Sequence, residues 1–188
     1  MLTAPVRAIV IAALLAAAPS LAAKAAAPAE VPATPAATSR RAPAAAGPCR
    51  AGETAVVVDT RAHRMHLCAR GEVRQSFVVA LGTRGVGKQH RGDNRTPLGK
   101  YPLGAPRASQ SFHRFVPVAY PTPAQARLGF TGSAIGIHGP PRGLAGLAAG
   151  LAPVDWTAGC IAVDSDEEID AVASWIRRED VKTVRLEW

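Results

Sequence analysis

The sequence of 188 residues predicts a mainly β domain with one clear helix near its C-terminus. Two observations lead to this prediction. Short runs of β-branched and other apolar residues are separated by turns rich in Gly, Pro and Asp, which is typical of paired strands. One segment, residues 165–178, repeats its apolar side chains at the 3.6-residue period of an amphipathic helix.

The first 48 residues are expected to form a targeting segment and a linker rather than part of the domain. They hold 20 alanines, against 19 in residues 49–188. In residues 1–23, Arg7 precedes an apolar run of about 11 residues and small residues follow, which is the layout of a secretory signal peptide. That run is shorter than the roughly 20 residues that span a bilayer, although an uncleaved anchor is the alternative. Residues 24–48 are rich in Ala and Pro and predict an extended linker.

The domain begins with three predicted strands that are joined by turns. They cover residues 54–58, 64–68 and 75–81, and the first two form a hairpin. Residues 82–99 contain five glycines and Pro97, so we expect a long loop there. Further short strands are predicted at residues 115–119, 134–138, 160–163 and 182–186.

The predicted helix has a defined start and end. Ser165 and Glu168 match a capping box, in which each side chain satisfies a free backbone N–H group at the helix start. Acidic residues occupy the first turn, and Arg177 and Arg178 the last, as the helix dipole favours. The apolar face consists of Ile169, Val172, Ala173 and Ile176. The acidic cluster also suggests a metal site, but capping and solvated charge explain it better.

The three cysteines predict one disulfide and one functional thiol. Cys49 lies just before the first strand and Cys68 ends the second, so the hairpin can bring the two together. An exported protein folds in an oxidising compartment, which favours a Cys49–Cys68 disulfide. Cys160 stands apart from this pair.

Cys160 is a candidate nucleophile because of its neighbours in the chain. It follows Gly159 and enters an apolar strand, and a glycine there lets a substrate approach and frees N–H groups to face an oxyanion. A thiol needs a base to form a thiolate near neutral pH, and His138, beside a glycine at another strand end, is the best candidate. A buried structural cysteine is the alternative, and a zinc site on Cys160 and His138 lacks a closely spaced ligand pair.

Three motifs follow one another along the domain. Residues 92–101 read Gly-Asp-Asn-Arg-Thr-Pro-Leu-Gly-Lys-Tyr, His138 stands in Ile-His-Gly, and residues 157–161 read Thr-Ala-Gly-Cys-Ile. In this order they resemble the signature of the L,D-transpeptidase (YkuD-type) catalytic domain, over about residues 54–187.

The resemblance implies a mainly β fold, a β-sandwich or barrel, that needs no metal ion or organic cofactor. Cys160 matches the nucleophile of the family, and His138 matches its general base and acid. The backbone N–H of Cys160, with that of Gly159 or Ala158, matches the oxyanion donors. The motif residues expected to contact the substrate are Thr157, Gly139 and Tyr101.

The resemblance also implies a substrate and a reaction. Cys160 would attack a peptidoglycan stem peptide at the carbonyl between an L-centred and a D-centred residue, expelling D-alanine and leaving a thioester. An amine would then accept the acyl group, which gives a cross-link, a lipoprotein attachment or an exchanged D-amino acid. The protein would act as a monomer in the periplasm or cell envelope. A non-catalytic cell-wall-binding module with the same fold is the alternative of another class.

Two departures from the family pattern concern the acyl acceptor. The usual His before Gly-Cys is Ala158, and the usual Asn or Arg two residues after the cysteine is Ala162. Residues 155–163, Asp-Trp-Thr-Ala-Gly-Cys-Ile-Ala-Val, resemble a subgroup that includes hydrolases which remove lipoproteins from peptidoglycan. Water is therefore the alternative acceptor, and an L,D-carboxypeptidase or endopeptidase is the alternative function.

Charge is divided unevenly along the domain. Residues 84–142 contain nine Lys or Arg and one acid, whereas residues 155–180 contain eight acids and two arginines. The basic stretch surrounds the His138 motif, so we expect it to attract the carboxylates of stem peptides, although a solvated surface explains the same charge. A pI near 10.3 also suggests nucleic acid, but the signal peptide and the lack of interleaved aromatic residues argue against that partner.

Two further expectations follow from pairing Cys160 with His138. A papain-like protease is disfavoured because its cysteine precedes its histidine in the chain, whereas here His138 comes first. If His138 activates Cys160, acylation should weaken as the pH falls through the titration range of the histidine.

Overall fold

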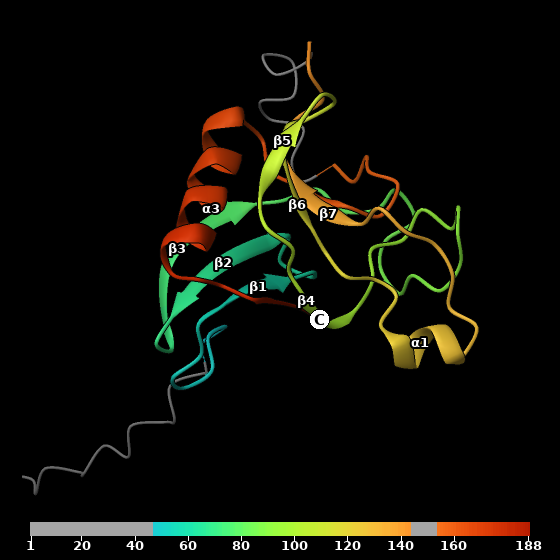
Figure 1. The fold of residues 1–188 in the computed structure, drawn as a ribbon, viewed down its shortest axis with the longest axis horizontal. Coiled ribbons are helices and arrows are strands. Elements are labelled where there is room, and N and C mark those ends of the chain that lie inside the picture. The colour runs from blue at the N-terminus through green and yellow to red at the C-terminus, as the bar shows by residue number, and fades with distance from the viewer. Residues whose placement is uncertain (1–46, 144–153) are drawn as a thin grey trace, which may run out of the picture. The chain divides into compact units, whose positions relative to one another are not determined.

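Two β-sheets form the frame of the domain in the computed structural model, which describes residues 47–143 and 154–188 (Figure 1). The predicted signal peptide, and all of the predicted linker except its last two residues, lie outside the described residues. The strands are β1 (Ala55–Asp59), β2 (Arg64–Ala69), β3 (Glu72–Val78), β4 (Gly99–Pro102), β5 (Arg107–Ser109), β6 (His113–Pro117), β7 (Gly136–His138), β8 (Ile161–Ala162) and β9 (Thr183–Glu187). The helices are α1 (Pro123–Arg127) and α3 (Asp166–Arg178).

The two sheets share one hydrophobic core. One sheet has the strand order β3-β2-β1-β9-β4, and the other has the order β5-β6-β7-β8. Most neighbouring strands are antiparallel, but β1 pairs with β9, and β7 with β8, in parallel. Buried side chains of both sheets and of α3 meet in a single cluster. The mainly β fold class predicted from the sequence is therefore confirmed.

Strand β1 shows how the sequence distributes residues between two faces. Val56 and Val58 point into the core between the sheets, while Ala55 and Val57 lie on the other face beside Cys68. Successive strand residues face opposite sides, so an unbroken apolar run produces a strand that is buried on both faces.

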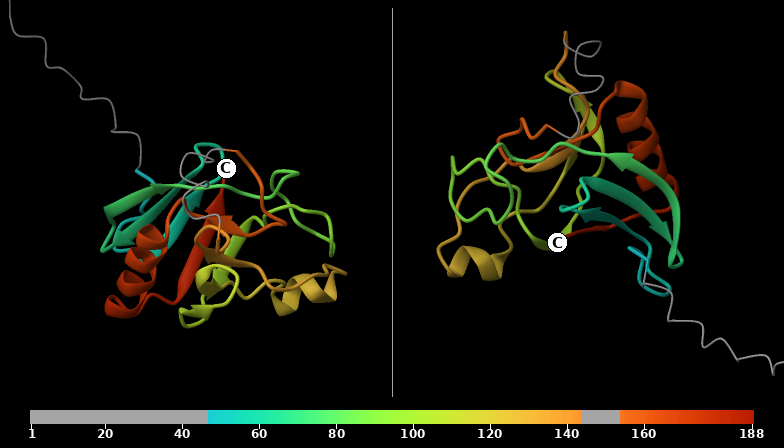
Figure 2. Two further views of the ribbon diagram at one scale, coloured as in Figure 1. Left: turned by 90° about the horizontal axis from the view of Figure 1, so that it is seen from above. Right: turned by 180° about the vertical axis from the view of Figure 1, so that it is seen from behind.

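Helix α3 closes one side of the core. It packs against β6 and lies beside the β5–β6 hairpin in the views of Figures 1 and 2. Its predicted apolar face is buried, together with Trp175. The Ser165 hydroxyl accepts the N–H of Glu168 at 3.2 Å, as predicted, but the Glu168 carboxylate accepts the N–H of Asp164, one residue before the cap. Neither helix of the described residues is long and apolar enough to cross a membrane.

The predicted strands correspond to β1, β2, β3, β6, β7, β8 and β9, with ends that differ by a few residues. The third strand, predicted at residues 75–81, begins at Glu72 and ends at Val78. Beyond it the chain crosses to the other sheet, where Ala80 exchanges two backbone hydrogen bonds with Ala162 of β8. Residues 82–98 form the predicted loop, with isolated bridges in place of a strand.

Strands β4 and β5 and helix α1 were not predicted. β4 contains a Gly and a Pro, and β5 has three residues without a buried side chain, so neither shows apolar alternation. Helix α1 does carry a signal, because Thr122 and Gln125 form a complete capping box around Pro123.

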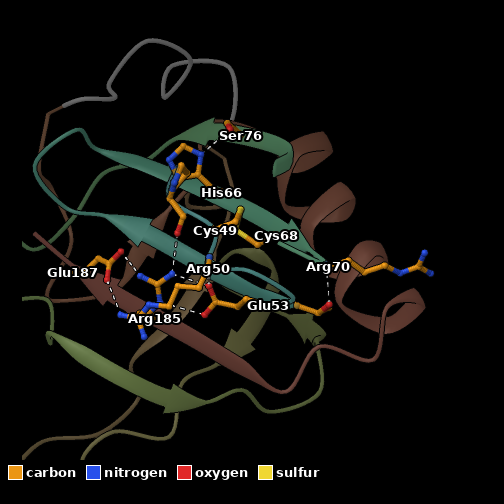
Figure 3. Close-up of a disulfide and its surroundings, with 11 residues drawn as sticks. Cys49, Arg50, Glu53, His66, Cys68, Arg70, Ser76, Arg185 and Glu187 are labelled. Atoms are coloured by element: carbon orange, nitrogen blue, oxygen red, sulfur yellow. Dashed lines mark hydrogen bonds and ion pairs between the residues drawn. A yellow bond between two sulfur atoms is a disulfide. The ribbon is translucent and has the colours of Figure 1, made fainter. Parts of the chain in front are cut away.

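The segment before β1 is fastened to the outer face of the five-stranded sheet (Figure 3). Cys49 and Cys68 are joined by a disulfide with an S–S distance of 2.00 Å, which is the pairing expected from the hairpin. Buried Arg185 of β9 donates to the carboxylate of Glu53 at 2.7 Å and to the carbonyl of Pro48 at 2.8 Å. The disulfide and the Arg185 contacts therefore lie on the face of this sheet that points away from the core.

Candidate active site

His138 and Cys160 lie on neighbouring strands of the four-stranded sheet. β7 ends at His138, and Cys160 directly precedes β8, which runs parallel to β7 with Ala162 opposite His138. Because alternate residues of a strand face the same side, Cys160 and Ala162 share a face with His138. The fold thus brings together the two residues that the sequence singled out.

The turn that presents Cys160 requires a glycine at position 159. The φ of Gly159 is +124°, and a Cβ atom there would lie 2.5 Å from the carbonyl oxygen of Arg95. The Thr157 hydroxyl holds the turn from inside, since it accepts the N–H of Gly159 at 3.0 Å and donates to the carbonyl of Cys160 at 2.8 Å. Thr157 and Gly159 therefore set the backbone conformation at the thiol.

The same contacts reduce the expected set of oxyanion donors. The N–H of Gly159 already donates to the Thr157 hydroxyl, so it is not a free donor. The N–H groups of Ala158 and Cys160 have no acceptor within residues 47–143 and 154–188. These two groups remain as candidate donors to a developing oxyanion.

The His138 imidazole is buried in a slot of aromatic rings. Its Nδ1 lies 2.7 Å from the carbonyl oxygen of Gly139, and since a carbonyl only accepts, Nδ1 carries the proton and Nε2 keeps its lone pair. The Phe112 ring stacks on the imidazole with 3.9 Å between centroids, and the Phe115 ring lies nearly parallel at 6.3 Å. The Trp156 ring meets it edge-on at 5.7 Å. Burial lowers the pKa of His138 to about 4, although the hydrogen bond to Gly139 acts in the opposite direction.

The Cys160 thiol is half-buried, and it is not bonded to the imidazole. Its Sγ donates to the carbonyl of Ala134 at 3.5 Å. Burial raises the pKa of the Cys160 thiol, while the N–H of Gly136 and the ammonium of Lys88 oppose that rise. The resting pair is a neutral thiol and a neutral imidazole, and no hydrogen bond joins Sγ to Nε2 of His138 within the described residues. Such bonds are often long without substrate and tighten when it binds.

Cys160 opens into a pocket of about 310 Å³ that has a positively charged wall. Lys88 and Arg91 line the pocket, and none of its described lining residues is acidic. Ala158 also lines the pocket and is exposed. It therefore presents only a methyl group to the pocket, at the position where the family that the sequence resembles usually has a histidine. Lys88 is paired with Asp93 behind the wall, so exposed Arg91 is the cation that most favours a ligand bearing a carboxylate.

The loop of residues 82–98 fixes the position of the Lys88 charge. The Asp93 carboxylate accepts from Nζ of Lys88 at 2.7 Å and from the N–H groups of Gln89 and His90 at 2.8 Å. Burial alone would raise the pKa of Asp93, but these hydrogen bonds outweigh it and hold the pKa well below its usual range. Lys88 itself is only 4% exposed, so its charge is held beside the thiol pocket rather than dispersed in solvent.

The three residues that were expected to contact the substrate are all buried. Tyr101 is 1% exposed in the core, and its hydroxyl donates to the carbonyl of Leu98. Gly139 packs against α3, where a Cβ atom would lie 2.9 Å from Cγ2 of Ile169. Thr157 is 3% exposed and shapes the Cys160 turn. None of the three lines the pocket beside Cys160. Gly139 and Thr157 instead hold His138 and Cys160 through hydrogen bonds, whereas Tyr101 fills the core.

Three residues of the site were missed by the sequence reasoning. Lys88 is a single lysine in a polar loop, and Phe112 is a single aromatic residue near a turn, so neither belongs to a pattern. Trp156 does have a signal, because it lies inside the motif that contains Cys160. The group that orients the His138 ring, which the sequence left open, is the carbonyl of Gly139.

Proteins of known structure share this architecture. The helical cell shape determining protein Pgp2 from Campylobacter jejuni superposes with a TM-score of 0.56 at 25% identity, over 70% of this chain and 46% of Pgp2. Bd1075 from Bdellovibrio bacteriovorus superposes with a TM-score of 0.51 at 19% identity, over 71% of this chain and 47% of Bd1075. The chain thus spans less than half the length of either neighbour. No curated protein matches the sequence.

A family comparison covers the two strands and the turn that carry the site. The family model of the L,D-transpeptidase catalytic domain (YkuD) matches residues 53–185, which is more than half of the chain and includes both His138 and Cys160. The chain therefore belongs to the family of L,D-transpeptidase (YkuD) catalytic domains.

Proposed function

We propose that this protein is an exported cysteine acyltransferase that acts on peptidoglycan stem peptides in the periplasm or cell envelope. One observation carries the proposal: the Cys160 thiol opens into a cationic pocket on the same face of the sheet as the unprotonated Nε2 of His138. The family match supports the reaction class. The similarity to Pgp2, a helical cell shape determining protein, supports a role in shaping the cell wall.

In the first half-reaction, Cys160 becomes acylated. Nε2 of His138 takes the thiol proton, Sγ forms a bond to the carbonyl carbon, and the backbone N–H of Cys160 stabilises the oxyanion. The imidazolium then returns the proton to the leaving nitrogen as the C–N bond breaks. The free amine of a D-residue departs, and the acyl group remains on Sγ as a thioester.

In the second half-reaction, an acceptor attacks the thioester. Nε2 of His138 takes a proton from the acceptor, the new bond forms at the carbonyl carbon, and the thiol is regenerated with that proton. An amine acceptor gives a cross-link, an attached lipoprotein or an exchanged D-amino acid. Water gives hydrolysis, which is the activity of an L,D-carboxypeptidase or endopeptidase.

Hydrolysis is the second candidate because of two alanines. Ala158 leaves the pocket wall beside Cys160 uncovered, and Ala162 places only a methyl group opposite His138. Both positions lack the polar side chains that the family usually carries, so nothing at these two positions holds an amine acceptor by hydrogen bonding. The motif of residues 155–163, which resembles that of the lipoprotein-removing hydrolases, points the same way.

Product analysis distinguishes transfer from hydrolysis. Purified protein is incubated with tetrapeptide muropeptides and an excess of a free D-amino acid, and the products are separated and weighed by mass spectrometry. Exchanged or dimeric products establish transfer, whereas tripeptide alone establishes hydrolysis. A Cys160→Ala variant has to lose either activity, and unchanged turnover in that variant would show that Cys160 is not the nucleophile. A wild-type protein that binds the wall but turns over no muropeptide would favour the non-catalytic wall-binding module.

The proposed export is tested separately. The full chain, expressed in a bacterium with an outer membrane, should lose about 23 N-terminal residues, which the mass of the periplasmic protein reports. A mass that retains Arg7 would favour a membrane anchor instead.

A further inference from the structure

Phe112 lies at the tip of the β5–β6 hairpin, and the turn that follows it is strained. His113 has a φ of +59°, in the left-handed region that residues other than Gly rarely occupy. The N–H of Arg114 donates back to the carbonyl of Phe112 at 2.5 Å. A turn closed across two residues with a positive central φ is a rare, strained form of the γ-turn. Strain of this kind persists only where surrounding contacts hold it in place.

Asp170 of α3 supplies those contacts. Its carboxylate accepts from Nε2 of His113 at 2.9 Å and pairs with Nε of Arg114. The hydrogen bond with His113, and then that with Arg114, keep the pKa of Asp170 below its usual range. On the other side of the turn, the Ser109 hydroxyl accepts the N–H of Phe112 at 3.2 Å. The hairpin tip is thereby joined to the helix through one acidic side chain.

The ring that this turn presents covers one face of the imidazole. Phe112 and His138 are 20° from parallel, with 3.9 Å between centroids, which is close stacking. Phe115, opposite His138 across the β6–β7 pair, and Ala162, opposite it across the β7–β8 pair, continue the apolar surroundings in the plane of the sheet. The guanidinium of Arg107 lies over the Phe115 ring at 5.2 Å. The imidazole therefore has one polar partner among the described residues, the carbonyl of Gly139.

We propose that the Phe112 ring is a clamp on the His138 imidazole and that Asp170 is the positioning residue that keeps the clamp closed. The clamp holds the ring plane in which Nδ1 meets the Gly139 carbonyl, and this leaves Nε2 as the only nitrogen that can accept a proton. It also keeps water off the ring face, so that the base stays neutral until it receives the thiol proton. The catalytic consequence rests on the proposed function, but the clamp itself does not.

The clamp is tested by the titration of one histidine. The imidazole of His138 is followed by NMR from pH 3 to 8 in the wild type and in three single variants, Phe112→Leu, Asp170→Asn and Glu167→Gln. Glu167 is the control for charge, because this exposed acid lies one turn before Asp170 and interacts with His113 through its charge but makes no hydrogen bond to His113 or Arg114. The charged and titratable groups that surround the imidazole and its clamp are Cys160, His113, Arg114, Asp166, Glu167, Asp170 and Arg107.

The expected results follow from water reaching the ring. In the wild type the midpoint lies at about 4. Phe112→Leu should raise it by about one pH unit or more, and Asp170→Asn by about half a unit or more, while Glu167→Gln leaves it in place. An unchanged midpoint in Phe112→Leu would overturn the clamp, and an unchanged midpoint in Asp170→Asn alone would overturn the role of Asp170.

A second variant tests the role of Asp170 even if Asp170→Asn does not fold. His113→Asn removes one of the two contacts to Asp170, yet asparagine tolerates the left-handed conformation at this position. It should raise the midpoint in the same direction, and an unchanged midpoint there would also count against Asp170. In turnover assays, Asp170→Asn should lower kcat about tenfold with little change in KM, because the base is misplaced while the pocket is intact.

The titration separates this inference from the proposed function. It needs no substrate, so the clamp can hold even if stem peptides prove not to be substrates. In turn, wild-type turnover of stem peptides with an unchanged midpoint in Phe112→Leu would retain the function and remove the clamp.

Discussion

The two sides of the candidate active site differ in how strongly they oppose charge. On the thiol side, burial raises the pKa of the Cys160 thiol, but the ammonium of Lys88 in the pocket wall opposes that rise. On the imidazole side, His138 lies among Phe112 and Trp156, where positive charge is disfavoured. Both members of a thiolate–imidazolium pair are therefore disfavoured by burial, and only the thiol side has a nearby cation that offsets part of the cost.

The two pKa shifts set the resting charge of the candidate nucleophile and of the candidate base. The pKa of the thiol is raised and that of His138 is lowered to about 4, so both groups are neutral at neutral pH. In the proposed reaction, the thiol would therefore become reactive as it transfers its proton to Nε2 during attack, rather than beforehand. A neutral thiol is also a poorer target for oxidants, which suits the single free cysteine of the described residues.

Replacing the imidazole of His138 should have the largest effect. His138→Gln is expected to slow acylation of Cys160 by roughly 10³-fold or more, because no other base of the site can take the thiol proton. Alkylation of Cys160 by iodoacetamide at alkaline pH should persist, since solvent then removes that proton. His66→Gln on β2 is the control, because that histidine bonds only to Ser76 far from the site. Acylation at the wild-type rate in His138→Gln would end the pairing of the two residues.

Changing the turn between the two sides should have the next largest effect. Gly159→Ala forces a Cβ atom to within 2.5 Å of the Arg95 carbonyl and leaves a positive φ, so turnover should fall by about 100-fold and stability by about 2 kcal/mol. Gly85→Ala is the matched control, because Gly85 also has a positive φ but open space around it. Equal losses in the two variants, measured by urea unfolding and turnover, would show that the Arg95 contact does not matter.

The pH profile tests the imidazole side directly. Acylation should stay high down to about pH 4 and fall below it, because the neutral imidazole is the base and its pKa is about 4. The sequence alone suggested the ordinary range of histidine, and the burial of the ring moves that expectation downward. If the acylation rate of the folded protein falls near pH 6.5 instead, burial among the aromatic rings does not lower the pKa of His138.

The same shift makes stability depend on pH with a definite sign. The pKa of His138 is about 4 in the folded state and 6.5 in its model value, so the unfolded chain binds more protons between those limits. Stability is therefore fully present above pH 6.5 and declines by up to about 3 kcal/mol as the pH falls toward 4. Urea unfolding at several pH values measures the decline, which His138→Gln should reduce. A smaller decline should remain, because burial also lowers the pKa of His66.

Neutralising the pocket wall on the thiol side should have the smallest effect. Arg91→Gln removes an exposed cation, so KM for a stem peptide should rise about threefold to tenfold while kcat changes little. Arg127→Gln is the control, because Arg127 is exposed at the end of α1 and does not line the pocket. An equal rise of KM in both variants would show that the rise comes from the lower net charge of the protein and not from the pocket wall.

Much of the fold was readable from local patterns, because each pattern reflects forces between neighbours in the chain. The unbroken apolar run predicted strand β1, which is buried on both faces, and Ser165 predicted where helix α3 begins. Strand β5 was missed because its three residues bury no side chain. Strand β3 ends before the predicted residue 81 because Ala80 pairs with a strand of the other sheet. Pairing between distant segments leaves no local signature.

The site divides in the same way. The motifs around His138 and Cys160 identified the candidate pair, and both contain a glycine that the packing requires. A Cβ atom would meet the Ile169 side chain at Gly139 and the Arg95 backbone at Gly159. Tyr101 was assigned to the substrate because it ends a motif, but its ring fills the core. A motif marks residues that the fold needs as well as residues that the substrate touches, and only burial separates the two.

The amino-acid sequence by itself determined a mainly β domain and its helix, because these depend on residue type and local period, and its motifs named Cys160 and His138 as the candidate nucleophile and base. Only the tertiary structure decided the state of the site. Phe112, Lys88 and Asp170 come from separate segments, and their distances to the reacting pair are set by sheet pairing and helix packing. Those distances determine the local dielectric and charge, and hence which proton is held at rest.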